Sequence, residues 1–509
     1  MGDIYTNPPQ SRNEAILRAT IDGVEYTAPP QSRIEDLLLE LKSVIENGSV
    51  VVNPEGEATG DMTKVQVGEN IYNVDDAVAR QGISDLIEKI DNMENHVIYG
   101  FHISSTESDP AYKVSYLRDA AGAVPAHMDY VNDKFDYGSW ENAFFMPRPC
   151  MLKADGSVDY YLDPYDYTKK EDGTTASDVA DPSYNGNAMM EWGRDGKKIW
   201  MKIVPDANHL GASVYIADYQ ADSDFHDWPF HNCNGDSVDH FYTAIYNGSL
   251  DGNNKLRSIS GQQVMNKKTA DQEIGYARAN NSGTNILWDI EHFSDIILIN
   301  MLLILMGKSV DTQAVFGQGL NTGGIEAINN NFRTGQQDAK GLFYGTNSGT
   351  IATDSFVNCV KVFGMENWYG FQWRRYLGHV MDDGTQKVKL TFGTEDGSTA
   401  TDFIENGTPT GNGFKSTGAT AFSGTFGNYI KNEYYTGDAM VPCGSLDGTS
   451  KTYYCDACWY NNSGVRVPCR GGASSSGAED GAFSVALSVA ASGSSWSIGA
   501  ALSCKPLAA

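Results

Sequence analysis

Apolar and small residues alternate along two stretches near the C-terminus of this 509-residue chain, residues 483–489 and 496–502. A period of two is that of a β-strand with one buried face. Residues 488–495, SVAASGSS, are rich in turn-forming types. The pattern therefore predicts a hairpin of two half-buried strands. Its expected apolar face consists of Phe483, Val485, Leu487, Val489, Trp496, Ile498, Ala500 and Leu502.

The opposite face of this expected hairpin has an unusual composition. Between residues 471 and 503, 24 of 33 residues are Gly, Ala or Ser. The composition alone is typical of a disordered tail, but the alternation indicates a folded segment. Because such small side chains add little β-propensity, we infer that something other than strand stability determined this face.

Apolar residues follow helical spacing in two stretches of the first 100 residues. Residues 8–17 recur as residues 29–38, and each copy has an extended Pro-Pro followed by a Ser that suits a helix start. Residues 64–67 and 71–74 look like short strands between the two helices. The first helical stripe consists of Ile34, Leu37, Leu38, Leu41, Val44 and Ile45, and the second, within residues 75–95, of Ile83, Leu86, Ile87, Ile90 and Met93.

Two short helices with no obvious core are unstable alone. Self-association would place the stripes of several chains along one axis, so residues 1–100 are predicted to form an oligomeric stalk, as a homotrimer. The alternative is that each helix packs on its own domain.

Beyond residue 99, aromatic residues, glycines and Asp-Gly turn signals such as Asp155-Gly156 and Asp383-Gly384 dominate. One strong helix is expected within residues 289–306. Its apolar run, 296–306, is too short to span a bilayer and predicts a buried helix. Because no linker is visible, residues 101–509 are predicted to form one large domain, or two tightly packed lobes. The chain as a whole reads as an α+β protein rich in strands and loops.

The charge of the chain argues against a nucleic-acid partner. It has 37 Lys and Arg against 65 Asp and Glu, a net charge of −28, whereas nucleic-acid binding needs a basic footprint.

The first ten residues lack the basic region and apolar run of a signal peptide. Without a signal or a membrane span, the chain fits a protein released within a particle, and fits a cytosolic protein equally well.

Three groups of residues have the composition of a chemical site. Residues 218–240 include Asp222, Asp224, His226, Asp227, His231, Asp239 and His240, but lack the spaced acids of a calcium loop. Cys455 and Cys458, flanked by Cys443 and Cys469, fit no strong zinc template. With 65 acidic residues, some pair of carboxylates that could support glycan hydrolysis is inevitable, so the sequence alone gives such a pair little weight. With no catalytic motif evident, we expect a binding protein with no catalytic residue, metal or cofactor.

The C-terminal spacing GG-x4-GA-x2-GAF-x-V-x-L-x4-S-x-S-x-W-x-IGAALS resembles the variable region of targets of diversity-generating retroelements. In that family, adenine mutagenesis of Asn (AAC) codons rewrites the variable positions, and residues 471–509 contain no Asn. The resemblance implies a variable region at about 471–503 and ligand-binding positions at Ala473, Ser475, Ser476, Ser484, Ala486, Ser488, Val489, Gly493, Ser495 and Ser497. Ser474, where the family usually has Trp, and Glu479, which no adenine change in AAC encodes, complete the set. The alternative is a plain Ser/Ala strand pair.

Two further motifs resemble the C-type-lectin-like fold in its formylglycine-generating-enzyme-like branch. They are MMEW through IWMK at 189–202, and GMENWYGFQW at 364–373. The paired catalytic cysteines of that enzyme have no clear match, so the resemblance implies the fold without the activity. Residues 1–100 resemble the N-terminal stalks of phage tail and fibre proteins.

Together the resemblances imply a receptor-binding protein of a phage or prophage, made in the host cytoplasm and carried at the tail or fibre tip of the virion. Residues 1–100 would attach to other tail proteins, and the C-terminal domain would bind a host-surface receptor, protein or glycan. Trp459, Tyr460 and Arg466 are predicted fixed anchors, since these residue types dominate binding hot spots. A tail-associated glycan hydrolase and a purely structural virion protein are the alternatives. Neither nucleic-acid binding nor membrane insertion is expected.

Overall fold

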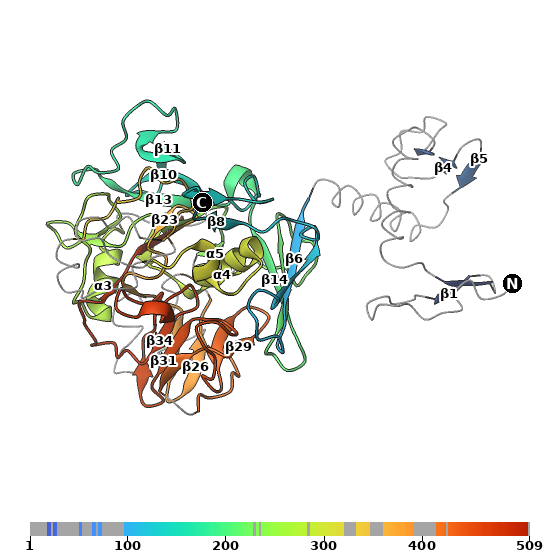
Figure 1. The fold of residues 1–509 in the computed structure, drawn as a ribbon. Helices are drawn as coiled ribbons and strands as arrows, with labels where there is room; N and C mark the ends of the chain where they lie inside the picture. The colour runs from blue at the N-terminus through green and yellow to red at the C-terminus, as the bar shows by residue number, and fades with distance from the viewer. Residues whose placement is uncertain are drawn as a thin grey trace. The chain divides into compact units, whose positions relative to one another are not determined.

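The chain divides into two compact units, residues 1–97 and 98–509 (Figure 1). The computed structural model describes residues 18–21, 24–27, 50–52, 64–67, 70–73, 96–227, 231–233, 236–281, 286–319, 332–346, 360–390, 392, 414–423 and 426–506.

The first unit contains two small antiparallel sheets. Strands β1 (Arg18–Ile21) and β2 (Val24–Thr27) form one, and β3 (Val50–Val52), β4 (Lys64–Val67) and β5 (Asn70–Asn73) form the other. The strands expected at 64–67 and 71–74 are thus confirmed, the second beginning one residue earlier. Both expected helices lie outside the described residues, and the stalk and its trimer stay predictions.

The second unit is rich in strands, as the sequence predicts. Its described part contains three α-helices, α3 (Ala270–Arg278), α4 (Phe293–Gly307) and α5 (Thr312–Phe316). In Figure 1, α4 and α5 lie at the centre. On one side are β10 (Arg148–Lys153), β11 (Val158–Asp163) and β13 (Gly186–Trp192), and on the other are β26 (Thr385–Val388), β31 (Ala457–Tyr460) and β34 (Val485–Leu487).

Four larger sheets surround these helices. A seven-stranded antiparallel sheet has the order β12 (Asp166–Lys170), β11 (Val158–Asp163), β10 (Arg148–Lys153), β13 (Gly186–Trp192), β18 (Phe241–Ala244), β36 (Leu502–Pro506) and β21 (Ile286–Ile290). A six-stranded mixed sheet has the order β28 (Gly427–Tyr429), β31 (Ala457–Tyr460), β34 (Val485–Leu487), β33 (Cys469–Arg470), β24 (Trp373–Arg375) and β35 (Ile498–Gly499). Two four-stranded sheets have the orders β14 (Trp200–Pro205), β15 (Ala212–Ala217), β6 (Ile98–Ile103), β7 (Val114–Arg118), and β27 (Lys415–Ser416), β26 (Thr385–Val388), β25 (His379–Asp382), β32 (Val465–Arg466).

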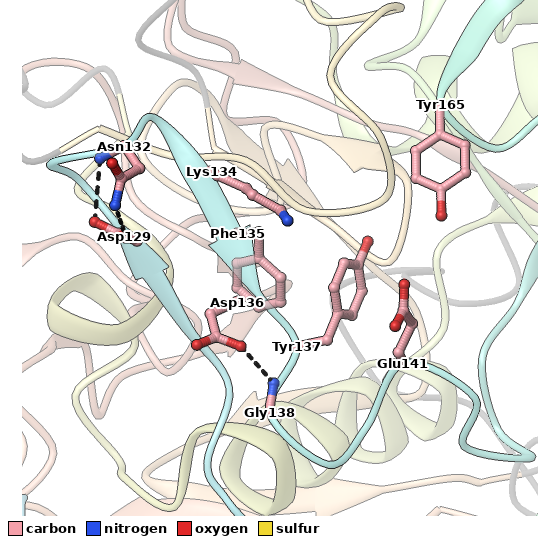
Figure 2. A pocket seen from close by; sticks show the side chains of 9 residues that line it. All are labelled: Asp129, Asn132, Lys134, Phe135, Asp136, Tyr137, Gly138, Glu141 and Tyr165. Atoms are coloured by element: carbon pink, nitrogen blue, oxygen red, sulfur yellow. Dashed lines mark hydrogen bonds between the residues drawn. The ribbon is translucent and has the colours of Figure 1, made fainter.

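Short antiparallel pairs complete the described strands. The hairpin of β8 and β9 borders a surface pocket (Figure 2). The pairs are β8 (His127–Asp129) with β9 (Lys134–Asp136), β16 (Asn232–Cys233) with β17 (Asp236–Ser237), β19 (Ser249–Leu250) with β20 (Leu256–Arg257), β22 (Lys361–Val362) with β23 (Met365–Glu366), and β29 (Asn432–Tyr435) with β30 (Met440–Cys443). The expected turn at Asp383-Gly384 connects β25 and β26, with positive φ at both residues.

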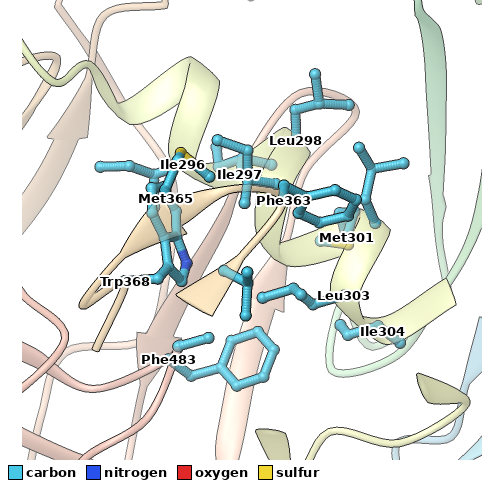
Figure 3. Close-up of a cluster of buried hydrophobic side chains, with 14 of the residues drawn as sticks. Ile296, Ile297, Leu298, Met301, Leu303, Ile304, Phe363, Met365, Trp368 and Phe483 are labelled. Carbon is cyan, nitrogen blue, oxygen red and sulfur yellow. The ribbon is translucent and has the colours of Figure 1, made fainter. Parts of the chain in front are cut away.

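Helix α4 is the apolar helix expected within residues 289–306, and it is buried along its whole length. His292 caps its N-terminus by accepting a hydrogen bond from the Ser294 amide. Its side chains pack against Met365, Trp368 and Phe483 (Figure 3). Burying one Leu or Ile side chain stabilises a fold by about 1.5–3 kcal/mol, so α4 contributes a large part of the core. None of the described helices is long and apolar enough to cross a membrane.

The expected C-terminal hairpin is wrong. β34 pairs with β31 and β33, β35 pairs with β24, and the strands β33 and β24 lie between β34 and β35. The expected second strand is also divided, since β35 belongs to the six-stranded sheet and β36 to the seven-stranded one. Alternation reports only that one face is buried, whereas strand neighbours are chosen by contacts far along the sequence.

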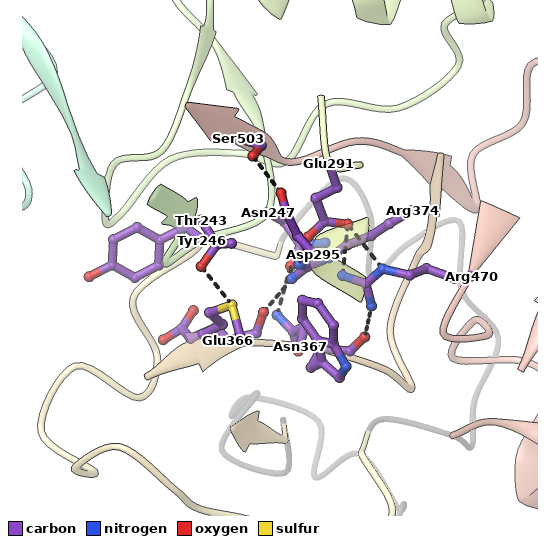
Figure 4. Close-up of polar contacts among 12 residues, drawn as sticks. Thr243, Tyr246, Asn247, Glu291, Asp295, Glu366, Asn367, Arg374, Arg470 and Ser503 are labelled. Atoms are coloured by element: carbon purple, nitrogen blue, oxygen red, sulfur yellow. Dashed lines mark hydrogen bonds and ion pairs between the residues drawn. The ribbon is translucent and has the colours of Figure 1, made fainter. Parts of the chain in front are cut away.

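A buried ion-pair network ties the six-stranded sheet to the end of β21 (Figure 4). The Glu291 carboxylate accepts a hydrogen bond from Arg374 Nη1 at 2.9 Å and from Arg470 Nη2 at 2.7 Å, and all three side chains are at most 3% exposed. The Arg470 guanidinium also lies 3.5 Å from the centre of the Trp368 ring and donates to the Trp368 carbonyl. One face of the Arg470 guanidinium and its N–H groups are therefore engaged.

Trp368 extends this network to the C-terminal segment. Its indole Nε1 donates to Asn300 Oδ1 at 3.1 Å, and Asn300 Nδ2 donates to the Ala482 carbonyl at 2.8 Å. A continuous chain of contacts thus runs from Glu291 through α4 to residue 482.

We expect Glu291→Gln to lower the free energy of unfolding by about 3–5 kcal/mol, because it leaves two buried guanidinium groups without their counter-charge. Urea unfolding followed by tryptophan fluorescence measures this loss. Lys202→Met, which breaks pairs with the partly exposed Asp222 and Asp224, is the control and should cost below about 1 kcal/mol. Equal losses in the two variants would contradict the structural role of the network.

Candidate functional site

The candidate ligand-binding segment, residues 471–497, runs from the end of β33 to the start of β35. It contains a bend at Gly471 and Gly472, a short 3-10 helix (Gly477–Glu479), strand β34 and a loop over residues 488–497. Its apolar positions Phe483, Val485 and Leu487 are buried, as the alternation predicts, while Trp496 is half-buried.

The twelve predicted ligand-binding residues do not share one open face. Ser475 is exposed, and seven others are half-buried: Ser476, Glu479, Ser488, Val489, Gly493, Ser495 and Ser497. Four are buried: Ala473, Ser474, Ser484 and Ala486. The expectation of an open face at these four positions is wrong in this chain.

Neighbouring strands and turns enclose the four buried positions. Ala486 packs with Cys469 and Ile498 under Trp373 and Val489. The Ser474 amide donates to the Phe371 carbonyl, and its hydroxyl is buried without a hydrogen-bond partner among the described atoms. Ser484 donates from its hydroxyl to the Glu479 carbonyl, which turns its side chain back onto the segment.

Two buried aspartates hold the backbone on either side of the 3-10 helix. Asp480 Oδ1 accepts from the Ala473 amide at 3.0 Å, and Asp456 Oδ2 accepts from the Phe483 amide at 2.8 Å. Burial raises the pKa of both carboxyls well above the usual value. Burial therefore favours the protonated form of both carboxyls.

Glycine is required beside each of these carboxyls. A Cβ at Gly472 would lie 1.6 Å from Asp480 Oδ1, and one at Gly481 would lie 2.0 Å from Asp456 Oδ1. Gly472 also has a φ of 79°, which other residues rarely adopt. The fixed Gly and Asp of the segment therefore form its internal scaffold.

Helix α5 supports the same stretch from below. Ala482 donates from its amide to Thr312 Oγ1 at 3.1 Å, and Gln313 Nε2 donates to the Ala478 carbonyl at 3.1 Å. Together with the Asn300 contact to Ala482, these bonds use only the main chain of residues 478–482. These contacts therefore do not themselves depend on which side chain stands at residue 478 or 482.

The loop at 488–497 is held through alternate carbonyl groups. Each accepts a hydrogen bond of 2.8–2.9 Å from a donor outside the segment. The donor and acceptor pairs are Val467 N and Val489 O, Ala270 N and Ala491 O, Arg375 Nη2 and Gly493 O, Lys267 N and Ser495 O, and Trp373 N and Ser497 O. Arg375 is itself fixed by a fully buried ion pair with Glu273. The path of this loop is therefore set mainly by donors outside the segment. Within the loop, Ser495 Oγ also accepts from the Ser497 amide at 3.3 Å, and a Cβ at Gly493 would lie 2.9 Å from the Ala490 carbonyl oxygen.

The predicted anchors occupy different environments. Trp459 is half-buried and makes an edge-to-face contact with Trp373 at 5.3 Å between ring centres. Tyr460, which points to the other face of β31, is 7% exposed and stacks on Phe422. Arg466 is half-buried and donates to the Ser463 carbonyl. Trp373, which the sequence analysis did not select, lies beside the segment with Trp459.

A small cavity of about 40 Å³ lies beneath residues 482–485. Glu433 lines it with a carboxylate oxygen that has no partner among the described atoms, and burial raises the pKa of this acid well above the usual value. His379 lines it as well, and burial lowers the pKa of its imidazole to about 3. Burial thus favours the uncharged form of both groups, which lie inside the core.

The other candidate sites are occupied by structural contacts. In residues 218–240, Asp218 pairs with Lys197, and Asp227 pairs with Lys198. His231 accepts from the Ile199 amide, and burial lowers its pKa to about 3. Seven cysteines in the described part of the chain are buried thiols. No group of three or more His, Cys, Asp or Glu among the described residues is arranged to hold a metal ion.

No protein-family model matches this chain, and no curated protein matches it. Its function is therefore argued from the arrangement of residues around segment 471–497.

We expect Asp480→Asn to flatten the dependence of stability on pH. The folded wild type keeps a proton that the unfolded chain releases near pH 4, so its stability falls as pH rises from about 4 through the raised pKa. Asn cannot titrate, yet it keeps the acceptor for the Ala473 amide. Urea unfolding at pH 5 and pH 8 measures the difference. Asp480→Ala, which loses that acceptor, should be less stable than Asp480→Asn at both values, and an unchanged pH dependence would refute the assignment.

Adjacent serines provide a matched test of burial. Ser475→Tyr should change the free energy of unfolding by less than about 0.5 kcal/mol, because its side chain is exposed. Ser474→Tyr should cost at least about 1–3 kcal/mol, because the position is fully buried. Equal tolerance at the two positions, measured by thermal and urea unfolding, would show that residue 474 is displayed after all.

Proposed function

We propose that this chain is a phage or prophage receptor-binding protein that displays part of segment 471–497 as a retroelement-diversified ligand-binding face. One observation carries the proposal: the main chain of 488–497 is fixed by five carbonyl contacts to donors outside the segment. Such a path keeps its shape when side chains change, which a diversified face requires. The small residues found at its proposed variable positions are also those that adenine mutagenesis of AAC produces.

The displayed positions are the exposed Ser475 and the seven half-buried residues named above. The four buried positions and the Gly and Asp scaffold hold the face from within. Activity in this proposal is binding without chemistry, with no catalytic residue or cofactor.

Trp459 and Trp373 form a fixed aromatic platform beside this face. They come from β31 and β24, which flank β34 and β33 in the six-stranded sheet. Tryptophan supplies more contact area than any small side chain, and it is enriched in binding hot spots. Phe426, 57% exposed and 6.2 Å from the Tyr460 ring, is a separate exposed aromatic residue beside β28.

The remaining parts of the proposal concern the whole particle. Residues 98–509 would be a C-type-lectin-like domain, and residues 1–97 a trimeric stalk bound to other tail proteins. Three copies of a weak face would bind a cell-surface receptor through multivalency. The location would be the tail or fibre tip of the virion.

Sequencing the few kilobases downstream of the gene tests the diversification. We expect a near-copy of codons 471–503, with AAC at the rewritten positions and mismatches confined to template adenines, next to a reverse-transcriptase gene. A gene with neither feature would reject diversification and favour a fixed adhesin.

Attachment to host cells tests the aromatic platform. Trp459→Ala should weaken binding of the full chain at least tenfold, because a central Trp truncation costs about 2 kcal/mol or more. Tyr112→Ala, at a tyrosine that is 76% exposed and lies outside the segment, is the matched control and should bind like the wild type. Unchanged attachment of Trp459→Ala would favour a purely structural virion protein.

A further inference from the structure

A second concave site lies outside segment 471–497, beside the β8–β9 hairpin (Figure 2). This hairpin pocket has a volume of about 520 Å³, within the range of pockets that hold small organic ligands. It is formed by residues 129–141 together with Tyr165 from the turn between β11 and β12. It shares no residue with the face proposed above.

The floor of the hairpin pocket is aromatic and rigidly supported. Phe135 is buried and stacks on Phe343 at 4.5 Å between ring centres and on Phe316 at 6.0 Å. Tyr137 meets Phe135 edge-to-face at 4.9 Å and Phe343 at 5.7 Å. Because these rings are packed against α5 and its neighbours, the floor is preorganised for a ligand.

The rim of the pocket is polar. Figure 2 shows the Tyr137 and Tyr165 hydroxyls and the Glu141 carboxylate directed toward a common space. Glu141 is exposed and accepts no hydrogen bond from the part of the chain that the structure describes. Asp136 accepts a hydrogen bond from the Gly138 amide at 2.9 Å through one carboxylate oxygen. The Asp129 carboxylate, in contrast, is engaged by Val131 and Asn132.

Exposed apolar side chains gather at this pocket. Six large hydrophobic residues in the described part of the chain are exposed; one of them lines the pocket and two are linked to its lining residues. Tyr165, 64% exposed, lines the pocket, and Val131, 92% exposed, precedes the lining residue Asn132. The carbonyl of Val124 accepts a hydrogen bond from the amide of Ser139, the residue after the lining residue Gly138. An exposed ring beside carboxylate and phenol oxygens offers both an apolar and a hydrogen-bonding surface.

We infer that the hairpin pocket binds a neutral saccharide of two or three sugar units. The exposed Tyr165 ring can pack against the C–H face of a sugar, while Glu141, Asp136 and the Tyr137 hydroxyl bond its hydroxyl groups. Three carboxylates and one ammonium, that of Lys134, line the pocket, so its charge opposes acidic sugars. The site supplies a constant specificity that diversification of segment 471–497 leaves unchanged.

The test is an array of neutral and acidic glycans probed with the full chain, followed by calorimetric titration of the neutral glycan that binds best. We expect binding to a neutral glycan of at least two units, weakened at least tenfold by Tyr165→Ala and by Glu141→Gln. Both side chains are exposed, so neither change should unfold the protein. Tyr112→Ala, the exposed-tyrosine control, should bind like the wild type.

Four results would overturn the inference: no neutral glycan binds, only acidic glycans bind, both pocket variants bind as tightly as the wild type, or Trp459→Ala loses glycan binding. Trp459→Ala separates the two sites. It should keep the glycan affinity while it loses host attachment. Loss of glycan binding in Trp459→Ala would assign the sugar to the face at 471–497 instead.

Discussion

The buried carboxylate of Glu291, shared between Arg374 and Arg470, is the interaction on which the C-terminal half of the molecule depends. It joins the end of β21 to β24 and β33, the two strands that separate β34 from β35. Arg470 then fixes Trp368, which fixes Asn300 on the buried helix α4, which holds the main chain at Ala482. A charge cluster buried this deeply is costly unless every member is paired, so each residue in it restricts its neighbours.

Segment 471–497, held by this network, has two parts: residues that hold its backbone in place and side chains that lie on its open side. Asp456, Asp480 and the glycines beside them determine how the chain bends. Donors that include residues of α3 and β24 determine where the loop runs, and they bind main-chain carbonyls of the segment. Substitutions on its open side therefore change the surface without changing the fold, since such surface changes usually alter stability by less than about 0.5 kcal/mol.

The sequence predicted local features well and long-range pairing poorly. The buried helix in 289–306, the strands at 64–67 and near 71–74, and the burial of Phe483, Val485 and Leu487 follow from periodicity alone. The hairpin was wrong because period two cannot reveal that β33 and β24 insert between its strands. The same limit explains the errors among the twelve predicted site residues. The sequence does not distinguish an exposed serine such as Ser475 from an enclosed one such as Ser474. The Asp and Gly scaffold was missed because burial of a carboxyl is a property of packing, and the only local sign was Gly481 directly after Asp480.

The small size of the displayed residues limits how this chain can bind. A specific interface buries about 800 Å² on each partner, and a single Trp or Tyr buries about 150–250 Å². Ser, Gly and Val at the displayed positions contribute far less each, so most of the contact area in this variant must come from fixed aromatic residues such as Trp459 and Trp373. Replacement of a displayed Ser by Tyr would add area on an unchanged main-chain path. The fixed aromatic residues then provide an affinity that all variants share. The displayed positions determine which partner binds more tightly than that.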